Sequence, residues 1–176
     1  MRSNASGGIL LYRRRADTLE VLLAHPGGPY WKSQQFGSWS VPKGIAEDGE
    51  EALERVAQRE FAEETGFEVA SVAVDPSRPP LDLGEVQLKS GKVVRAWAIE
   101  GDLDPALAHS NEFEIEWPPR SGRRLMIPEV DKVAWFAPDE ARRRAHPVQA
   151  AFVDRLLVAL GDQPAAPGAT GSSAGT

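Results

Sequence analysis

Short apolar stretches separated by turn residues predict strands along much of the chain. The predicted strands cover Gly8–Tyr12, Leu19–Ala24, Leu83–Leu88, Lys92–Ile99 and Val130–Phe136. Arg13–Thr18 and Lys89–Gly91 separate two neighbouring pairs of these segments, so each pair is expected to form a hairpin. A further segment, Asn111–Trp117, alternates between acidic and apolar side chains, which is typical of a strand with one buried face.

Three other segments predict helices, and the chain ends in a segment of different composition. The predicted helices are Glu51–Thr65, Pro138–Arg144 and Val148–Leu160. Gly66 follows the first helix at the position where a left-handed C-terminal residue is expected. Strands mixed with a few helices predict an α+β fold or a mixed-sheet α/β sandwich. Gly161–Thr176 is rich in small residues and almost uncharged, so we expect one domain over residues 1–160 and a disordered tail over residues 161–176.

The composition excludes several classes of protein. The 176 residues include no cysteine, which excludes disulfides, thiolate metal sites, iron–sulfur clusters and a cysteine nucleophile. Apolar runs are far shorter than a membrane span. The start of the chain, Met1–Asn4, leads into a polar segment without the apolar core of a signal peptide, so a cytoplasmic location and no membrane partner are expected.

The net charge of −6 is concentrated in one segment. Residues 47–68 contain nine acidic and two basic side chains, whereas the rest of the chain carries 18 basic and 17 acidic ones. A nucleic-acid-binding face has the opposite sign, so this distribution argues against duplex DNA as a partner. A dense acidic cluster is stabilised either by water or by a divalent cation.

Helical periodicity separates these two interpretations of the acidic segment. At about 100° per residue, Glu60, Glu63 and Glu64 fall on the same side of the helix as Leu53 and Val56. The opposite side carries Glu51, Arg55, Gln58 and Ala62. A solvated acidic face, as in a scaffold protein, would place the glutamates on that opposite side. Carboxylates that converge on the inward side repel one another, and a hard divalent ion such as Mg²⁺ relieves this repulsion.

At this segment the residues resemble a known family. Gly44-Ile-Ala-Glu-Asp-Gly-Glu-Glu51 and Arg59-Glu-Phe-Ala-Glu-Glu-Thr-Gly-Phe67 resemble the Nudix box, G-x5-E-x7-R-E-U-x-E-E-x-G-U, where U is bulky and apolar. The second half matches at every fixed position. The first half contains one extra residue, which we place in the loop because an insertion in the helix would rotate its halves by about 100°. Glu51, rather than Glu50, is then the expected box glutamate.

The resemblance implies a fold and an activity. Trp39-Ser-Val-Pro-Lys-Gly44 is similar to the corresponding segment of Nudix enzymes that act on dinucleoside polyphosphates. The implied fold is the Nudix α/β/α sandwich, with a mixed sheet and the acidic helix in the active site. The implied activity is metal-dependent hydrolysis of a pyrophosphate linkage in a nucleoside diphosphate linked to X. The expected substrate is a small-molecule nucleotide, either a dinucleoside polyphosphate or a nucleoside triphosphate.

An alternative within the same family is a sensor that binds a nucleotide without hydrolysing it. Such proteins usually lose a carboxylate of the box, whereas this chain retains Glu60, Glu63 and Glu64. The oligomeric state stays open, because no feature of the sequence bears on it.

The resemblance also implies roles for single residues. Glu60 and Glu64 are the expected ligands of Mg²⁺ or Mn²⁺, Glu63 is a further ligand or the general base, and the Gly44 carbonyl completes the coordination. Arg59 is expected to pair with Glu51 or Glu50 and to brace the loop. Gly66 closes the box.

A second set of candidates lies outside the box. Many family members use a further glutamate, for which Glu129 is the first candidate and Glu112, Glu114 and Glu116 are alternatives. Arginine suits the clamping of phosphates because of its bidentate geometry. Candidates for that role, which are equally interpretable as surface charges, are Lys43, Arg95, Arg120, Arg123 and Arg124. Candidates for stacking a base, equally interpretable as core residues, are Trp39, Trp31 and Tyr30. Structural roles are expected for His25, His109 and His146, which lack metal-ligand spacing.

Overall fold

The sheet is built around β1 (Ala5–Arg15), in which Ser6–Tyr12 are buried on both faces. In the computed structural model, which describes residues 4–47 and 52–162, β1 pairs with a parallel neighbour on one side and an antiparallel neighbour on the other. The strand order is β4 (Leu81–Gln87), β5 (Val93–Glu100), β1, β2 (Thr18–Pro26) and β8 (Val130–Phe136), with the short β3 (Lys43–Ile45) paired to the start of β1. The apolar run at positions 8–12 suits this place because a strand covered on both faces needs apolar side chains on both.

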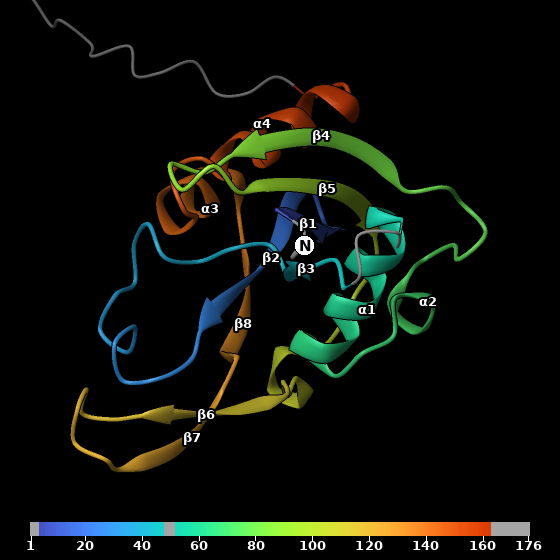
Figure 1. The fold of residues 1–176 in the computed structure, drawn as a ribbon. Coiled ribbons are helices and arrows are strands. Elements are labelled where there is room, and N and C mark those ends of the chain that lie inside the picture. The colour runs from blue at the N-terminus through green and yellow to red at the C-terminus, as the bar shows by residue number, and fades with distance from the viewer. Residues whose placement is uncertain (1–3, 48–51, 163–176) are drawn as a thin grey trace, which may run out of the picture.

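Helices cover both faces of this sheet (Figure 1). On one face lie α1 (Leu53–Thr65) and α2 (Val69–Val72), and on the other lie α3 (Pro138–Arg144) and α4 (Ala150–Ala159). Alternate residues of β1 serve the two layers: Leu11 packs in the cluster that contains Phe61 of α1, and Leu10 packs in the cluster that contains Phe152 of α4. The predicted α/β sandwich with a mixed sheet is confirmed.

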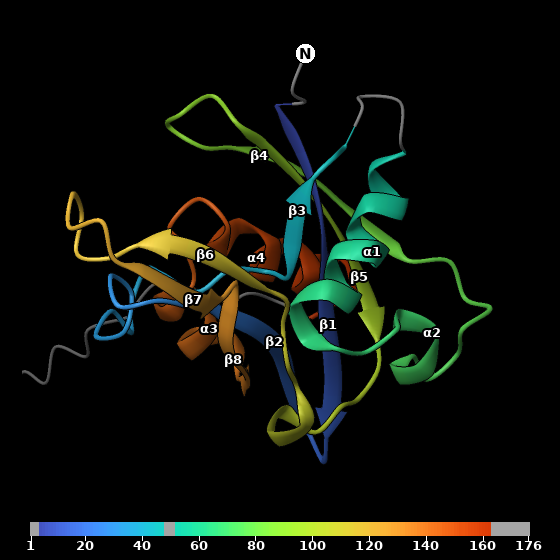
Figure 2. The same cartoon turned by 60° about the horizontal axis from the view of Figure 1, so that its bottom comes forward.

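A separate hairpin projects from this body, beginning near α1 and running away from it (Figure 2). It consists of β6 (Glu112–Glu116) and β7 (Arg124–Pro128), which pair antiparallel with Phe113 opposite Ile127. The prediction of a half-buried strand over Asn111–Trp117 is therefore wrong in its burial, since the residues of β6 are exposed apart from the partly buried Ile115. Alternation indicates a strand with two different faces, but whether a second layer covers one face depends on tertiary packing.

Most other predicted elements are confirmed, with changes in length. The first two strands extend to a turn at Ala16 and Asp17, so the predicted loop is shorter, and the predicted helix Pro138–Arg144 has those bounds in the structure. Four elements were missed: the strand β7, and three elements of only three or four residues, which carry no periodic signal, namely β3, α2 and η1 (Pro105–Leu107). Asp162 pairs with Arg14 at 2.9 Å, and residues 163–176 of the predicted tail lie outside the described residues.

Within the described part of the chain, no helix combines the length and the apolar character that crossing a membrane requires.

Glycine allows α1 to approach β1 closely. A Cβ atom built on Gly7 would lie 2.1 Å from the carbonyl oxygen of Leu53 and 2.9 Å from the amide nitrogen of Ala57. Both atoms belong to helix backbone, which cannot move aside as a flexible side chain does. The position of α1 on the sheet therefore depends on the missing side chain at residue 7.

We predict that Gly7→Ala destabilises the fold by about 3 kcal/mol, because the added methyl group forces the helix off the sheet. Urea denaturation measures this loss. The matched control is Gly91→Ala, where no atom lies within 4 Å of the new Cβ and only the left-handed φ of 83° is strained, at a cost of about 1 kcal/mol. Equal losses in the two variants would contradict the close contact between α1 and β1.

Candidate active site

The acidic residues of α1 line an open groove with a volume of about 1010 Å³. Five carboxylates line it: Glu60, Glu63 and Glu64 from α1, Glu129 from the residue before β8, and the exposed Glu47. The opposite wall consists of residues 43–47, and Phe113 of the hairpin lies at the groove as well. Residues separated by more than 60 positions are thus brought to one surface.

The inward direction of the glutamates agrees with the helical periodicity. Glu60 is only 8% exposed and continues the buried stripe of Val56 and Ala57, whereas Arg55 and Gln58 on the other side are exposed. Since the apolar residues of the first two turns fix the rotation of α1 on the sheet, the next turn must direct its carboxylates inward.

Glu60 lies directly against the backbone of Gly44. A Cβ atom built on Gly44 would lie 1.9 Å from the carboxyl carbon of Glu60. Gly44 belongs to β3 and is paired with Gly7 of β1, so one glycine pair holds both the helix and its carboxylate close to the sheet. The Gly44 backbone therefore lies beside the carboxylate of Glu60, and its carbonyl as a metal ligand stays a prediction.

Glu64 is bound to the same wall of the groove. Its Oε2 accepts a hydrogen bond of 3.0 Å from the backbone amide of Lys43. Burial raises the pKa of Glu64 to about 8, against the opposing effects of the Lys43 charge and this amide, and the charges of Glu60 and Glu129 act in the same direction as burial. A cation bound beside Glu64 would favour its ionised form.

Arg59 supplies positive charge to Glu60 and Glu63, the other two glutamates of α1 in the groove. Its Nη1 donates to Glu60 Oε1 at 2.7 Å and to Glu63 Oε1 at 3.3 Å, and its Nη2 donates to the carbonyl of Ile45 at 3.4 Å. The predicted partners of Arg59, Glu50 and Glu51, lie outside the described residues, as does most of the loop that would hold the extra residue of the box. Arg59 thus braces α1 against β3.

One arginine does not balance the carboxylates of the groove. Burial, together with the charge of Glu63, raises the pKa of Glu60 in spite of the Arg59 pair, and the same two causes raise the pKa of Glu129. Among the described residues, no three acidic or histidine side chains are arranged to hold a metal ion as they stand. The reason is visible in the contacts: Glu60 and Glu63 turn to Arg59, and Glu64 turns to the Lys43 amide.

The donor set nevertheless suits a hard divalent cation. It consists only of carboxylate and carbonyl oxygens, which are the ligands that Mg²⁺ prefers. Arg59 and the Lys43 amide hold these carboxylates through hydrogen bonds. Rotation of the glutamate side chains can exchange those hydrogen bonds for contacts with a cation.

Glu129 is positioned by backbone hydrogen bonds. Its amide donates to the carbonyl of Asn111 at 2.9 Å, and its carbonyl accepts from the amide of Gly27 at 3.0 Å. The alternatives in β6 are directed elsewhere: Glu114 pairs with Arg124 at 3.6 Å, and Glu116 accepts from the amide of Gly122 at 2.7 Å. Glu112 lines a smaller neighbouring cavity that shares Glu64 with the groove. Of the four candidates outside the box, the structure brings Glu129 to the carboxylates of α1.

Gly66, the last glycine of the box, ends α1 as expected. This residue has the left-handed φ of 79°, and its amide donates to the carbonyl of Ala62 at 2.8 Å. A side chain here would also collide with the ring of His109, since an added Cβ would lie 2.4 Å from that ring.

Several predicted substrate-binding residues lie away from the groove. The prediction that Trp39 stacks a base is wrong: the side chain is 2% exposed and packs edge-on against His25 and Phe136, at 5.0 Å and 4.9 Å between ring centroids. Arg95 pairs with Asp82 and Glu85 on β4 instead of lining the groove.

The remaining arginine candidates belong to the outer end of the hairpin. Arg120 and Arg123 are exposed in the turn between β6 and β7, and Arg124 is paired with Glu114. Tyr30 and Trp31 contact each other edge-on at 4.8 Å in the loop after β2. Of the predicted phosphate-binding and base-stacking residues, Lys43 is the one that the structure places in the groove.

Phe113 was missed as a site residue. Its place in an alternating strand predicted a buried position, but the side chain is 43% exposed at the groove. The alternation of Asn111–Trp117 placed Phe113 on an apolar face, but the sequence does not show that Phe113 borders the groove.

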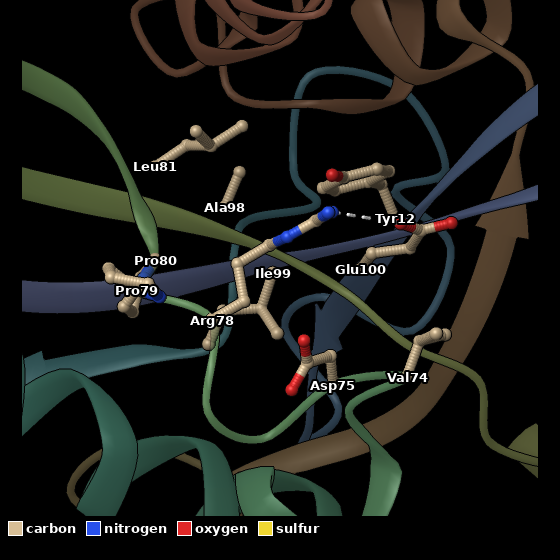
Figure 3. Close-up of a pocket in the computed structure, with 10 residues that line it drawn as sticks. All are labelled: Tyr12, Val74, Asp75, Arg78, Pro79, Pro80, Leu81, Ala98, Ile99 and Glu100. Atoms are coloured by element: carbon tan, nitrogen blue, oxygen red, sulfur yellow. Dashed lines mark ion pairs between the residues drawn. The ribbon is translucent and has the colours of Figure 1, made fainter.

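A separate cavity of about 310 Å³ lies at the far end of β1 (Figure 3). Its polar side chains belong to Tyr12, Asp75, Arg78 and Glu100, and the last two form a loose ion pair at 3.8 Å. It shares no lining residue with the acidic groove. The clustered carboxylates therefore distinguish the groove as the candidate active site.

Comparison with known proteins gives a family and several similar folds. The model of the NUDIX domain matches residues 2–156. A C. elegans Ap4A hydrolase, in a binary complex, is 18% identical with a TM-score of 0.62, over 89% of this chain and 98% of that one. The M. smegmatis Nudix hydrolase RenU is 24% identical with a TM-score of 0.52, over 92% and 89% of the two chains.

A third similar structure is the NUDIX domain of Shewanella oneidensis NrtR complexed with ADP ribose. It is 16% identical with a TM-score of 0.59, and the match covers 91% of this chain and 90% of that one. A search of curated protein sequences gives no match. At these identities the structural similarities establish the fold, whereas the domain model covers most of the sequence and confirms the resemblance of residues 44–67. The chain belongs to the Nudix family.

Proposed function

We propose that this Nudix pyrophosphohydrolase requires a divalent metal ion and cleaves the pyrophosphate linkage of a nucleoside diphosphate linked to X. The observation that carries the proposal is the convergence of Glu60, Glu63, Glu64 and Glu129 on one groove, opposite Gly44 and Lys43. The most favoured substrates are dinucleoside polyphosphates, followed by nucleoside triphosphates. The similarity to an Ap4A hydrolase supports this order.

The residues that would hold the metal are Glu60, Glu64 and the Gly44 carbonyl, with Glu63 as a further ligand or as the base. Bound there, Mg²⁺ or Mn²⁺ would neutralise the charge of the polyphosphate and polarise its phosphoryl oxygens. Lys43 stands on the opposite wall and would bind a phosphate oxygen through its ammonium group.

The chain supplies two carboxylates for proton transfer. Attack of water on phosphorus requires a base that accepts a proton, and Glu63 and Glu129 both face the groove. The charge of Glu63 contributes to the raised pKa of Glu129, so these two groups act on each other electrostatically. Arg59 holds Glu60 and Glu63 on one side of the groove and thereby fixes their orientation.

A nucleotide-binding sensor without catalysis is the alternative within the family. Its support is the similarity to the NrtR domain bound to ADP ribose. The retention of all three carboxylates of the box, each facing the groove, favours hydrolysis. The experiments below distinguish the two.

We predict that Glu64→Gln abolishes Mg²⁺-dependent hydrolysis, with a loss of at least about 100-fold, because the groove loses a charged oxygen ligand. The measurement is a hydrolysis screen over dinucleoside polyphosphates, nucleoside triphosphates, nucleotide sugars, NADH and capped RNA, with products separated by chromatography. Glu68→Gln is the matched control, since Glu68 follows the helix and is exposed. Unaltered turnover in Glu64→Gln would contradict the role of Glu64 as a metal ligand. Nucleotide binding without turnover in the wild type would indicate the sensor.

We predict that Glu129→Gln lowers kcat by about 10²-fold to 10⁴-fold, the range expected for loss of a general base. The effect on KM is smaller, because the amide keeps the shape and polarity of the side chain. Steady-state kinetics on the substrate found in the screen measures both constants. Glu114→Gln serves as the control, because Glu114 pairs with Arg124 on the hairpin; equal effects of the two substitutions would exclude this role for Glu129.

We predict that Glu64→Gln stabilises the metal-free protein in alkaline solution. The pKa of Glu64 is raised from 4.5 to about 8 in the folded state, so its ionisation opposes folding. The penalty is absent below pH 4.5, grows as the pH rises and is complete above pH 8, where the gain in Glu64→Gln is on the order of 1–3 kcal/mol. Thermal melting in EDTA at pH 4 and pH 9 tests this, and a difference independent of pH contradicts it.

A further inference from the structure

Phe113 stands out on the wall of the acidic groove. It is the one aromatic residue among the described residues that line the groove, and its side chain is 43% exposed. A ring left open to water beside the carboxylates of the groove forgoes the stabilisation that burial would give it. Such a position is explained if the ring contacts a ligand.

The backbone fixes Phe113 relative to the carboxylates. The amide of Asn111 donates to the carbonyl of Glu63 at 2.9 Å, and the carbonyl of Asn111 accepts from the amide of Glu129 at 2.9 Å. Asn111 and Phe113 are two residues apart, so they share one side of the strand at a separation of about 7 Å. The ring is therefore held at a set offset from two acidic residues of the groove.

The neighbouring strand supports this position. Phe113 is paired across the hairpin with Ile127, which is 7% exposed. Ile127 packs at the loop after β2, where a Cβ atom built on Gly28 would lie 2.7 Å from Ile127 Cδ1. The hairpin is thus packed against the body at the level of Phe113, whereas Met126, on the other face, is 56% exposed.

The opposite wall carries a second open apolar side chain. Ile45 of β3 lines the groove and is 45% exposed. The groove therefore combines charged groups that suit a metal–phosphate unit with apolar groups that suit the face of a flat ring.

We propose that Phe113 stacks on the nucleobase of the substrate while the phosphates lie at Lys43 and the carboxylates. This inference rests on the proposed hydrolytic function and specifies its substrate class. Because every base presents a π face, stacking selects nucleotides over base-free polyphosphates but distinguishes weakly between bases. No described carboxamide side chain lines the groove to read a base edge.

The test compares a nucleotide substrate with its base-free counterpart, adenosine 5′-triphosphate with ribose 5-triphosphate, in Phe113→Ala. We expect KM for the nucleotide to rise about 10-fold to 100-fold, as loss of one base–aromatic stack implies, with kcat little changed. Kinetics on ribose 5-triphosphate should be unaltered. Phe113→Tyr should restore the nucleotide KM, and Phe113→Leu, which is apolar without a ring, should not.

Met126→Ala is the matched control, because Met126 is an exposed apolar residue of the same hairpin outside the groove. Thermal melting confirms that each variant is folded. An equal KM change for both substrates, or none in Phe113→Ala, overturns the stacking role while the hydrolytic function stands. If the wild type hydrolyses neither substrate, the hydrolytic function fails and calorimetry is used to measure the binding of AMP and of ribose 5-phosphate in the presence of Mg²⁺. An AMP affinity that falls in Phe113→Ala still supports stacking, and an AMP affinity that does not change overturns it.

Discussion

The contact of α1 with the first strand through two glycines is the constraint on which the site depends. Gly7 lets the helix backbone touch β1, and Gly44, its partner in β3, lets the carboxylate of Glu60 lie against the strand. The two contacts are coupled, since both glycines occupy one rung of the β1–β3 ladder. A side chain at either position would separate the helix from the wall that completes the groove.

This close packing has an electrostatic cost. Glu60, Glu64 and Glu129 all have raised pKa values, with burial as the first cause, so the groove holds more negative charge than its environment stabilises. Active sites concentrate such groups because a ligand of opposite charge compensates them when it binds. Without such a ligand, Arg59 and the Lys43 amide limit the repulsion between the glutamates through their hydrogen bonds to Glu60 and Glu64. The metal–phosphate unit proposed as the ligand would relieve this repulsion.

The sandwich and the hairpin contribute different side chains to the groove. The sheet and α1 position the charged groups, because the apolar residues of α1 pack on the buried strand β1. The hairpin β6–β7 adds a side chain from outside the sandwich, since Phe113 lines the groove. The fold is shared with an Ap4A hydrolase and with a domain complexed with ADP ribose, so the fold by itself does not specify a substrate.

The sequence by itself determined the acidic helix and its inward face, because Val56, Ala57 and Glu60 follow one helical period and that period fixes which side is buried. It also determined the left-handed end of the helix at Gly66 and the family. Only the tertiary structure decided that Glu129, rather than Glu114, meets the helix, that Trp39 is core and that Phe113 is open. Local periodicity records which side of an element is apolar, whereas the partner of that side is set by contacts between segments distant in the chain.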